Sequence, residues 1–180
     1  KGVKPVATRP PATDLPWPFS MRGLMVAWNW IYLDPVRYTP QAARSAEWNR
    51  GAYLVQGLGH CGDCHTPRSW LGGVKAGNER DGSPFLAGAL VDGWYAQPLR
   101  HTDRPGMVQW TTQDIVEYLQ AGRTSQTAAF GPMVQVIENS TQHMTADDLK
   151  AVAVYLQTVG APASGTAPGV ARSPSQLRAA

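Results

Sequence analysis

The stretch Cys61-Gly62-Asp63-Cys64-His65 decides how this chain folds. Its pattern, Cys-x-x-Cys-His, is typical of the covalent attachment of a c-type haem. Two thiols three positions apart lie on one helical turn, so both can form thioethers with the haem while the adjacent imidazole reaches the iron. Cys61 and Cys64 are the two cysteines of the chain, so no second motif competes for them. We therefore predict one haem c, bound through Cys61 and Cys64 and ligated at the iron by His65.

Three other kinds of site use similar residues. A zinc site normally needs a second Cys/His pair at ligand spacing, whereas His60, His101 and His143 stand singly in the sequence. A dithiol redox motif would follow a strand in a βαβ pattern, whereas the residues before Cys61 have a helical pattern. A disulfide between the two cysteines stays open at this point.

The composition limits what such a chain can do. Its 180 residues are enough for one domain with extensions, and 43% hydrophobic residues indicate a globular protein. Fifteen prolines and 18 glycines predict many loops. The formal net charge of +3 is small, and no dense run of Lys or Arg is present, so we expect no nucleic acid as a partner.

We expect no transmembrane helix either. No apolar stretch reaches the roughly 18 residues needed to span a bilayer. The best candidate, residues 21–33, is shorter and carries Arg22 and Asn29. No charged-then-apolar leader follows Lys1, so we expect a leader to have been processed or excised.

The chain divides into four predicted segments. Residues 1–20 hold five prolines and form an extended linker. Residues 21–45 form a short helix and a connector. Residues 46–160 form the haem domain, in which residues 66–104 are a long loop rich in Gly, Pro and Asp. Residues 161–180 are rich in Ala, Pro and Ser and form a flexible tail.

The haem domain carries its own helix signals. Helical spacing predicts a helix over residues 46–58, which Gly57 and Gly59 would cap. Thr111 and Asp114 have the spacing of a capping box, and Gly122 is a stop signal.

Thr145 and Asp148 repeat the capping device before the last helix. One side of that helix has an apolar stripe, formed by Leu149, Val152, Leu156 and Val159.

The order of these elements resembles the class I cytochrome c fold, which is all-α, with helices and long loops wrapped around one covalent haem. In that fold the first and last helices cross where a glycine faces an aromatic ring, and Gly51 and Tyr155 fit those positions. The segment Pro84-Phe85-Leu86-Ala87-Gly88 looks like the family's Pro-x-Leu-x-Gly. The resemblance implies that Pro84 and Leu86 lie beside the haem, with the Pro84 carbonyl accepting the free imidazole proton of His65. The alternative is that Pro84 is an ordinary turn residue.

The sixth iron ligand separates electron transfer from ligand binding. A methionine thioether raises the potential and closes the iron to oxygen or peroxide. Met133 lies in Phe130-Gly131-Pro132-Met133, 68 residues after His65, and is the predicted ligand. Met144 is the alternative, although its place before Thr145 is typical of a packing residue, and a histidine or no ligand stays open. Met21 and Met25 are predicted to be packing residues. Met107 lies too early in the sequence to belong to the loop that carries the sixth ligand in the family.

Longer phrases resemble a haem domain of the multi-haem cytochrome c subunits of membrane-bound bacterial alcohol, gluconate and aldehyde dehydrogenases. The resemblance covers about residues 46–160 and also selects Met133. The phrases that carry it include Arg50 to Val55, Gly57 to Cys61, His65 to Arg68, Gly93 to Ala96 and Gly122 to Thr124. The chain departs from these subunits in carrying one attachment motif where they usually carry three. The segment Ala96-Gln97-Pro98-Leu99 also differs from the expected Ala-Pro-Asn-Leu.

The resemblance implies a periplasmic electron carrier, not an enzyme. A partner dehydrogenase or an adjacent haem domain would supply electrons, and quinone or a terminal oxidase would receive them. Trp94 and Arg123 are candidate partners of the haem propionates, and the alternatives are a core tryptophan and a solvated arginine. A rival reading is a peroxidase-like haem enzyme or gas sensor with an open sixth position, served by His60, His101 or His143. A third is a docking domain whose haem is only a folding core.

Overall fold

The computed structural model describes residues 4–12, 14–35, 37–82, 84–101 and 110–160. The chain forms two compact units, residues 1–37 and residues 38–180. The predicted tail, residues 161–180, and the candidate methionine Met107 lie outside the described residues.

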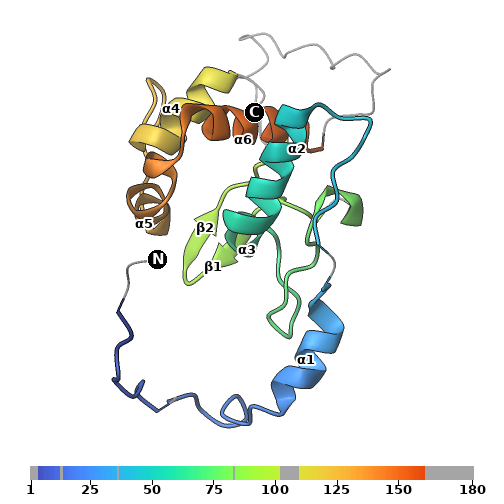
Figure 1. Cartoon of the computed structure of the whole chain (residues 1–180), viewed down its shortest axis with the longest axis vertical. Coiled ribbons are helices and arrows are strands. Elements are labelled where there is room, and N and C mark those ends of the chain that lie inside the picture. Colours follow the sequence, from blue (N-terminus) through green and yellow to red (C-terminus); the bar gives the residue numbers. More distant parts are fainter. Residues whose placement is uncertain (1–3, 13, 36, 83, 102–109, 161–180) are drawn as a thin grey trace, which may run out of the picture. The chain divides into compact units, whose positions relative to one another are not determined.

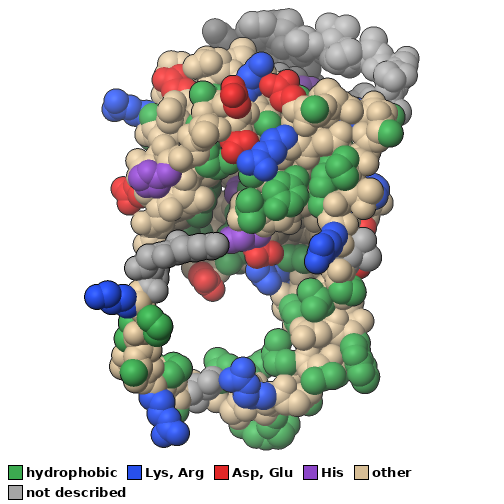
Figure 2. Space-filling model, in the orientation of Figure 1, with side chains coloured by type: hydrophobic (Ala, Val, Ile, Leu, Met, Phe, Trp, Pro, Cys, Tyr) green, Lys and Arg blue, Asp and Glu red, His purple; other side chains and the backbone are tan. Residues whose placement is uncertain are grey.

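Among the described residues of the first unit there is one helix, α1 (Leu24–Tyr32), which agrees with the short helix expected there. None of its residues is buried, and the rings of Trp28 and Tyr32 contact each other one turn apart, with centroids 5.0 Å apart. Met21 and Met25, expected to be packing residues, are 44% and 50% exposed. Hydrophobic side chains therefore gather on the surface of this unit (Figure 2).

The second unit holds the motif and most of the helices (Figure 1). Its described elements, in chain order, are α2 (Ala46–Tyr53), the π-helix η1 (Leu54–Leu58), α3 (Gly62–His65), the 3₁₀ helix η2 (Glu79–Asp81), β1 (Ala89–Val91), β2 (Trp94–Ala96), α4 (Thr112–Ala121), α5 (Pro132–Asn139), the 3₁₀ helix η4 (Thr141–His143) and α6 (Ala146–Leu156).

The all-α expectation needs a correction, because the long loop after the motif contains a small antiparallel sheet. Strands β1 and β2 pair with Ala89 opposite Ala96 and Val91 opposite Trp94. Asp92 and Gly93 connect them, both with positive φ, of 49° and 80°. An Asp-Gly pair suits such a two-residue turn because both positions require the left-handed region. The fold is therefore mostly helical with a two-stranded sheet, which is consistent with a cytochrome c-like fold.

The predicted helix boundaries on the C-terminal side are largely confirmed. Thr111 and Asp114 form a reciprocal capping box at the start of α4, and Gly122 ends that helix with a left-handed φ of 72°. The bonds from the backbone and side chain of Thr111 lower the pKa of Asp114. At α6 the Thr145 hydroxyl accepts from the N–H of Asp148, as expected.

The Asp148 carboxylate itself is engaged elsewhere. It accepts two hydrogen bonds from Arg50 of α2, at 2.7 and 2.9 Å, and the bond from Arg50 is the main cause that lowers its pKa. The residue predicted for a helix cap therefore also joins α2 to α6.

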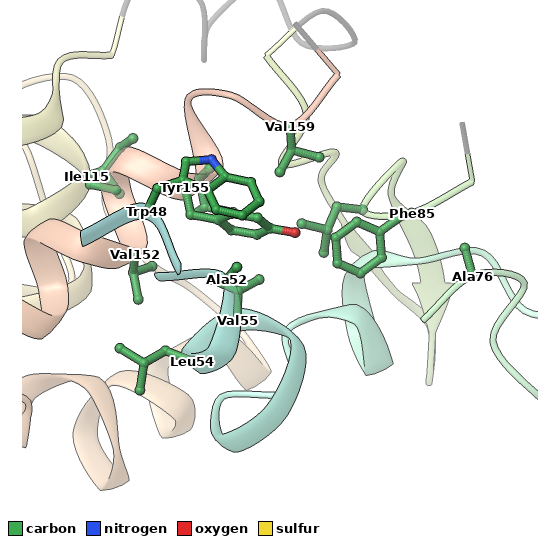
Figure 3. Packing of buried hydrophobic residues seen from close by; sticks show 13 residues of the cluster. Trp48, Ala52, Leu54, Val55, Ala76, Phe85, Ile115, Val152, Tyr155 and Val159 are labelled. Atoms are coloured by element: carbon green, nitrogen blue, oxygen red, sulfur yellow. The ribbon is translucent and has the colours of Figure 1, made fainter. Parts of the chain in front are cut away.

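Helices α2 and α6 cross in direct backbone contact. A Cβ atom on Gly51 would lie 2.0 Å from the carbonyl oxygen of Ala151 and 2.8 Å from the Cβ of Tyr155. No side chain fits there, so the crossing predicted from Gly51 and Tyr155 is confirmed. The Tyr155 ring meets the Trp48 indole edge to face at 5.1 Å (Figure 3). The predicted stripe on the last helix is buried in this core, at Leu149, Val152, Leu156 and Val159.

The carboxylate of Glu79 links the long loop after the motif to the crossing of α2 and α6 through hydrogen bonds. Glu79 of η2 accepts hydrogen bonds from the hydroxyl of Tyr155 at 2.8 Å and from the amide of Gln56 at 2.5 Å. Its other oxygen accepts from the side-chain amide of Gln41 at 2.6 Å. Burial, followed by the charge of Glu79, raises the pKa of Tyr155. The tyrosine therefore stays a neutral donor and links the loop to α6.

We expect Gly51→Ala to lower the free energy of unfolding of the haem-loaded protein by about 1–3 kcal/mol, because the new methyl group must push α6 away from α2. Gly57→Ala is the matched control, since a Cβ at that position would meet only the Tyr53 ring, at 4.0 Å. Guanidinium unfolding followed by circular dichroism measures both. Equal stability of the Gly51 variant and the parent would contradict the close crossing.

Tyr155→Phe should lower the free energy of unfolding by about 1–3 kcal/mol. It removes the hydroxyl that forms hydrogen bonds with the side chains of Glu79 and Gln56. Tyr53→Phe, at a position that is 37% exposed, should change the same free energy by less than about 0.5 kcal/mol. Urea unfolding of the two variants compares them directly. If Tyr155→Phe lowered the free energy of unfolding no more than Tyr53→Phe does, the contact with Glu79 would contribute little to stability.

Candidate haem site

The motif follows α2 through an unusual helix end. The helical run extends to Leu58, as predicted, but its last five residues form the π-helix η1 instead of α-helix. The N–H of Gly59 donates to the carbonyl of Leu54 at 2.7 Å, and the N–H of Cys61 donates to that of Val55 at 3.1 Å. The left-handed residue is His60, with φ 33°, whereas Gly59 keeps a right-handed φ of −83°. These wider turns lead directly into α3, which carries the motif.

The two cysteines differ in environment. Cys61 is partly buried against the hydrophobic core, and this burial raises the pKa of its thiol to about 11. Cys64 is exposed, and both are free thiols. A dithiol redox pair needs a thiol with a lowered pKa, which Cys61 does not provide. In the described part of the chain no group of three or more Cys, His, Asp or Glu side chains is placed to hold a metal ion.

His65 is oriented by the segment that follows the hairpin. Its Nδ1 lies 2.7 Å from the carbonyl oxygen of Gln97, and its own carbonyl accepts from the N–H of Gly88 at 2.7 Å. A carbonyl partner at Nδ1 makes that nitrogen the protonated one and leaves Nε2 as the nitrogen available to iron. The imidazole thus has the form that an iron ligand requires.

This contact differs from the expected one with Pro84. In the structure the Pro84 carbonyl accepts from the N–H of Ala87 at 3.2 Å, because Pro84 begins a turn. The carbonyl beside the imidazole comes instead from Gln97, in the phrase that departs from the family pattern. A role for Pro84 in the haem-loaded protein stays a prediction.

The residues next to Pro84 nevertheless pack behind the motif. Leu86 is fully buried with φ 56°, and its N–H donates to the hydroxyl of Thr66 at 3.0 Å. Its carbonyl accepts from the N–H of Leu99 at 2.9 Å. Phe85, 1% exposed, lies against Gly62 of α3. Sequence reasoning missed Thr66, whose buried hydroxyl holds this segment to the end of the motif.

The hairpin connects the motif to the methionine loop. Trp94 of β2 covers Gly131 so closely that a Cβ there would lie 2.7 Å from the indole ring. The ring of Phe130 lies 6.2 Å from that of Trp94, between centroids. Met133 follows in the first turn of α5 and is partly buried. Strand β1 contacts α3, so one hairpin touches the His65 side and the Met133 side of the domain.

Two other predicted residues have settled positions. Arg123 forms an isolated backbone bridge with Ala128, in the segment between α4 and α5. Its proposed pairing with a propionate, like that of Trp94, stays a prediction. Met144 packs against the buried core, as its place before Thr145 predicted, and this favours packing over iron ligation.

The three histidines proposed for the alternative, a haem enzyme or gas sensor, make local contacts. His60 Nδ1 lies 3.6 Å from the Asp63 carboxylate in an exposed pair. The backbone N–H of His101 donates to the carbonyl of Val159, and His143 Nε2 lies 3.0 Å from the carbonyl oxygen of Glu138. None of these contacts joins two of the histidines.

The surroundings of the motif fit a large apolar cofactor. Figure 2 shows a shaded recess in this face of the domain, between the part that holds α5 and the part that holds α2 and α3. Several large apolar side chains of these parts and of the hairpin are solvent-exposed, namely Leu58, Leu90, Trp94, Tyr95, Phe130 and Val136. Exposed apolar groups of this size normally mark a surface that a ligand or partner covers. Two thiols, an oriented imidazole and a thioether are the donor set of a c-type haem.

Comparison with known proteins shows which proteins the chain resembles. No family model matches the chain. The cytochrome c subunit of gluconate 2-dehydrogenase from Pantoea cypripedii is 43% identical over 163 residues, which are 89% of this chain and 37% of the relative. The cytochrome c subunit of the quinone alcohol dehydrogenase from Gluconobacter oxydans is 43% identical over 168 residues, 91% of this chain and 35% of the relative.

A third relative is the cytochrome subunit of fructose dehydrogenase from Gluconobacter japonicus, 39% identical over 162 residues, 89% of this chain and 32% of the relative. The chain therefore spans about a third of the length of these curated relatives. Over about nine tenths of its length, the chain is a homologue of the cytochrome c subunits of bacterial dehydrogenases.

Proposed function

We propose that this chain is an electron-transfer haem c domain of the periplasm or the periplasmic face of the inner membrane. It takes electrons from a partner dehydrogenase or an adjacent haem domain and passes them towards quinone or a terminal oxidase. The observation that carries the proposal is the oriented His65 imidazole within a covalent attachment motif. The cytochrome subunits that resemble the chain over most of its length support it.

The attachment side is built to hold one haem rigidly. Cys61 and Cys64 supply two thioether bonds, and one motif per chain means one haem. When bound, haem c supplies an iron centre that gains and loses one electron. The Gln97 carbonyl fixes the orientation of the His65 ring and increases the basicity of Nε2. This contact restrains the rotation of the imidazole, which suits a ligand in an electron carrier.

Met133 is the proposed sixth ligand. The loop before it is fixed where the Trp94 indole covers Gly131, whose φ of 59° requires glycine. Met133 then stands in the first turn of α5, where the helix limits the positions of its thioether. A neutral thioether stabilises the reduced iron and closes the position to oxygen. This closure is what separates a carrier from a peroxidase or gas sensor.

The donor and acceptor need only brief contact with the domain. Electron-transfer partners often bury less than about 1,200 Å² in total, so a small surface around the haem is sufficient. The apolar side chains beside the motif, including Leu58 at 67% exposure, provide candidate contacts for a neighbouring haem domain or dehydrogenase.

Met133→Ala should open the iron of the haem-loaded chain. We expect loss of the low-spin, methionine-ligated spectrum, rapid carbon monoxide binding and a potential lower by on the order of 0.1 V, within the range of about 0.8 V that axial ligands set. Optical spectroscopy with and without carbon monoxide, together with a redox titration, measures these changes.

Met144→Ala is the matched control, because Met144 packs against the core. It should retain the parent spectrum and lose about 1–2 kcal/mol of stability. If Met144→Ala opened the iron and Met133→Ala did not, the ligand would be Met144. A parent protein that already binds carbon monoxide rapidly would favour the enzyme or sensor reading.

A further inference from the structure

The first unit is unusually apolar on its surface. Of the twenty exposed large hydrophobic residues in the described part of the chain, eleven belong to residues 4–35. In α1 every residue except Asn29 is apolar or aromatic, so the helix has no wide polar face. Trp30 is 83% exposed and Ile31 is 62% exposed. A helix that is hydrophobic all round is normally buried in a protein or in a membrane.

The helix also has few local features that would stabilise it in water. It is nine residues long, and Gly23 at its N-cap provides no side-chain hydrogen bond. Its first turn has no acidic residue, its last turn has no basic residue, and no residue in it is buried. Isolated helices shorter than about 12–15 residues are marginal in water. A surface that covers α1 would therefore stabilise it.

The charge of this unit indicates the chemistry of that surface. Residues 1–37 contain five basic and two acidic residues, a net charge of +3. This equals the formal net charge of the whole chain, so the net charge of residues 38–180 is zero. An apolar segment with the entire positive excess suits a surface that is both apolar and anionic. A bilayer that contains anionic lipids has this combination.

The aromatic residues favour the same surface. Trp17, Trp28, Trp30 and Tyr32 combine apolar rings with a polar N–H or O–H group, which suits the headgroup level of a membrane. At 1.5 Å per residue α1 is about 14 Å long, less than half of a hydrocarbon core of about 30 Å. Within the described ranges no helix is long and apolar enough to cross a membrane. The helix therefore has the length to lie in the interface.

We propose that the segment from Leu15 to Leu33, with α1 at its centre, inserts into the headgroup region of an anionic lipid surface. Its hydrophobic side chains enter the acyl boundary, while Arg9, Arg22 and Arg37 remain at the phosphate level. The proposal concerns the first unit alone and does not depend on the iron ligands. It would place the haem domain at a membrane surface without a spanning helix.

Sedimentation of the haem-loaded chain with lipid vesicles tests this. One set of vesicles contains equal parts of phosphatidylcholine and phosphatidylglycerol, and the other is pure phosphatidylcholine. We expect the chain to sediment with the anionic vesicles, and to bind the neutral ones at least about tenfold more weakly. Raising the salt concentration should weaken binding to the anionic vesicles.

The double variant Trp30→Ser and Ile31→Ser should weaken binding by about tenfold or more. Its matched control is Trp70→Ser and Leu71→Ser, which also replaces an exposed Trp-aliphatic pair, but in the second unit. The control should bind like the parent. The variant Arg9→Gln and Arg22→Gln should lower the preference for anionic vesicles by about tenfold. An unchanged haem spectrum in each variant confirms that the haem domain is intact.

Three results would overturn the proposal. The parent chain could stay in the supernatant with both kinds of vesicle. The Trp70 and Leu71 control could lose as much binding as the Trp30 and Ile31 variant. The chain could instead self-associate in solution in a way that the Trp30 and Ile31 variant abolishes, which would make a second copy the partner of α1.

Discussion

The contact of α2 with α6 at Gly51 is the constraint on which the haem domain depends. The backbone of Ala151 occupies the space that any side chain at Gly51 would need, so the two helices can approach this closely only with glycine at position 51. Five residues of π-helix connect α2 to the attachment motif, so the position of the motif depends on the position of α2 at this crossing. Glu79 extends the constraint to the long loop through its bond with Tyr155. The loop in turn brings the Gln97 carbonyl to His65.

The site is assembled from segments that are far apart in the sequence. The hairpin packs against α3 at one end and, through Trp94, against Gly131 at the other. Large apolar side chains such as Leu90 and Phe130 stay exposed around it. A covalent haem would cover apolar surface of this kind and would serve as both the redox centre and part of the core. A haem in this position would explain how a domain with such long loops can adopt one defined structure.

Much of this arrangement could be predicted from local chemistry. The capping box at Thr111, the left-handed stop at Gly122 and the crossing at Gly51 each have a residue whose side chain, or lack of one, dictates the geometry. The sheet was missed although Asp92-Gly93 is a turn signal, because its strands are only three residues long. The Gln97 carbonyl could not be found, since any residue offers a carbonyl and only the backbone path decides where it points.

Coulometry and voltammetry of the haem-loaded chain test most directly whether it is a closed one-electron carrier. We expect one reversible wave, one electron per chain, and a midpoint potential that does not move when carbon monoxide is added. A potential that rises under carbon monoxide would contradict it, because the gas stabilises the ferrous form only where the iron has an open position. Transfer of more than one electron per chain would contradict the assignment of one haem to the single motif at Cys61 to His65.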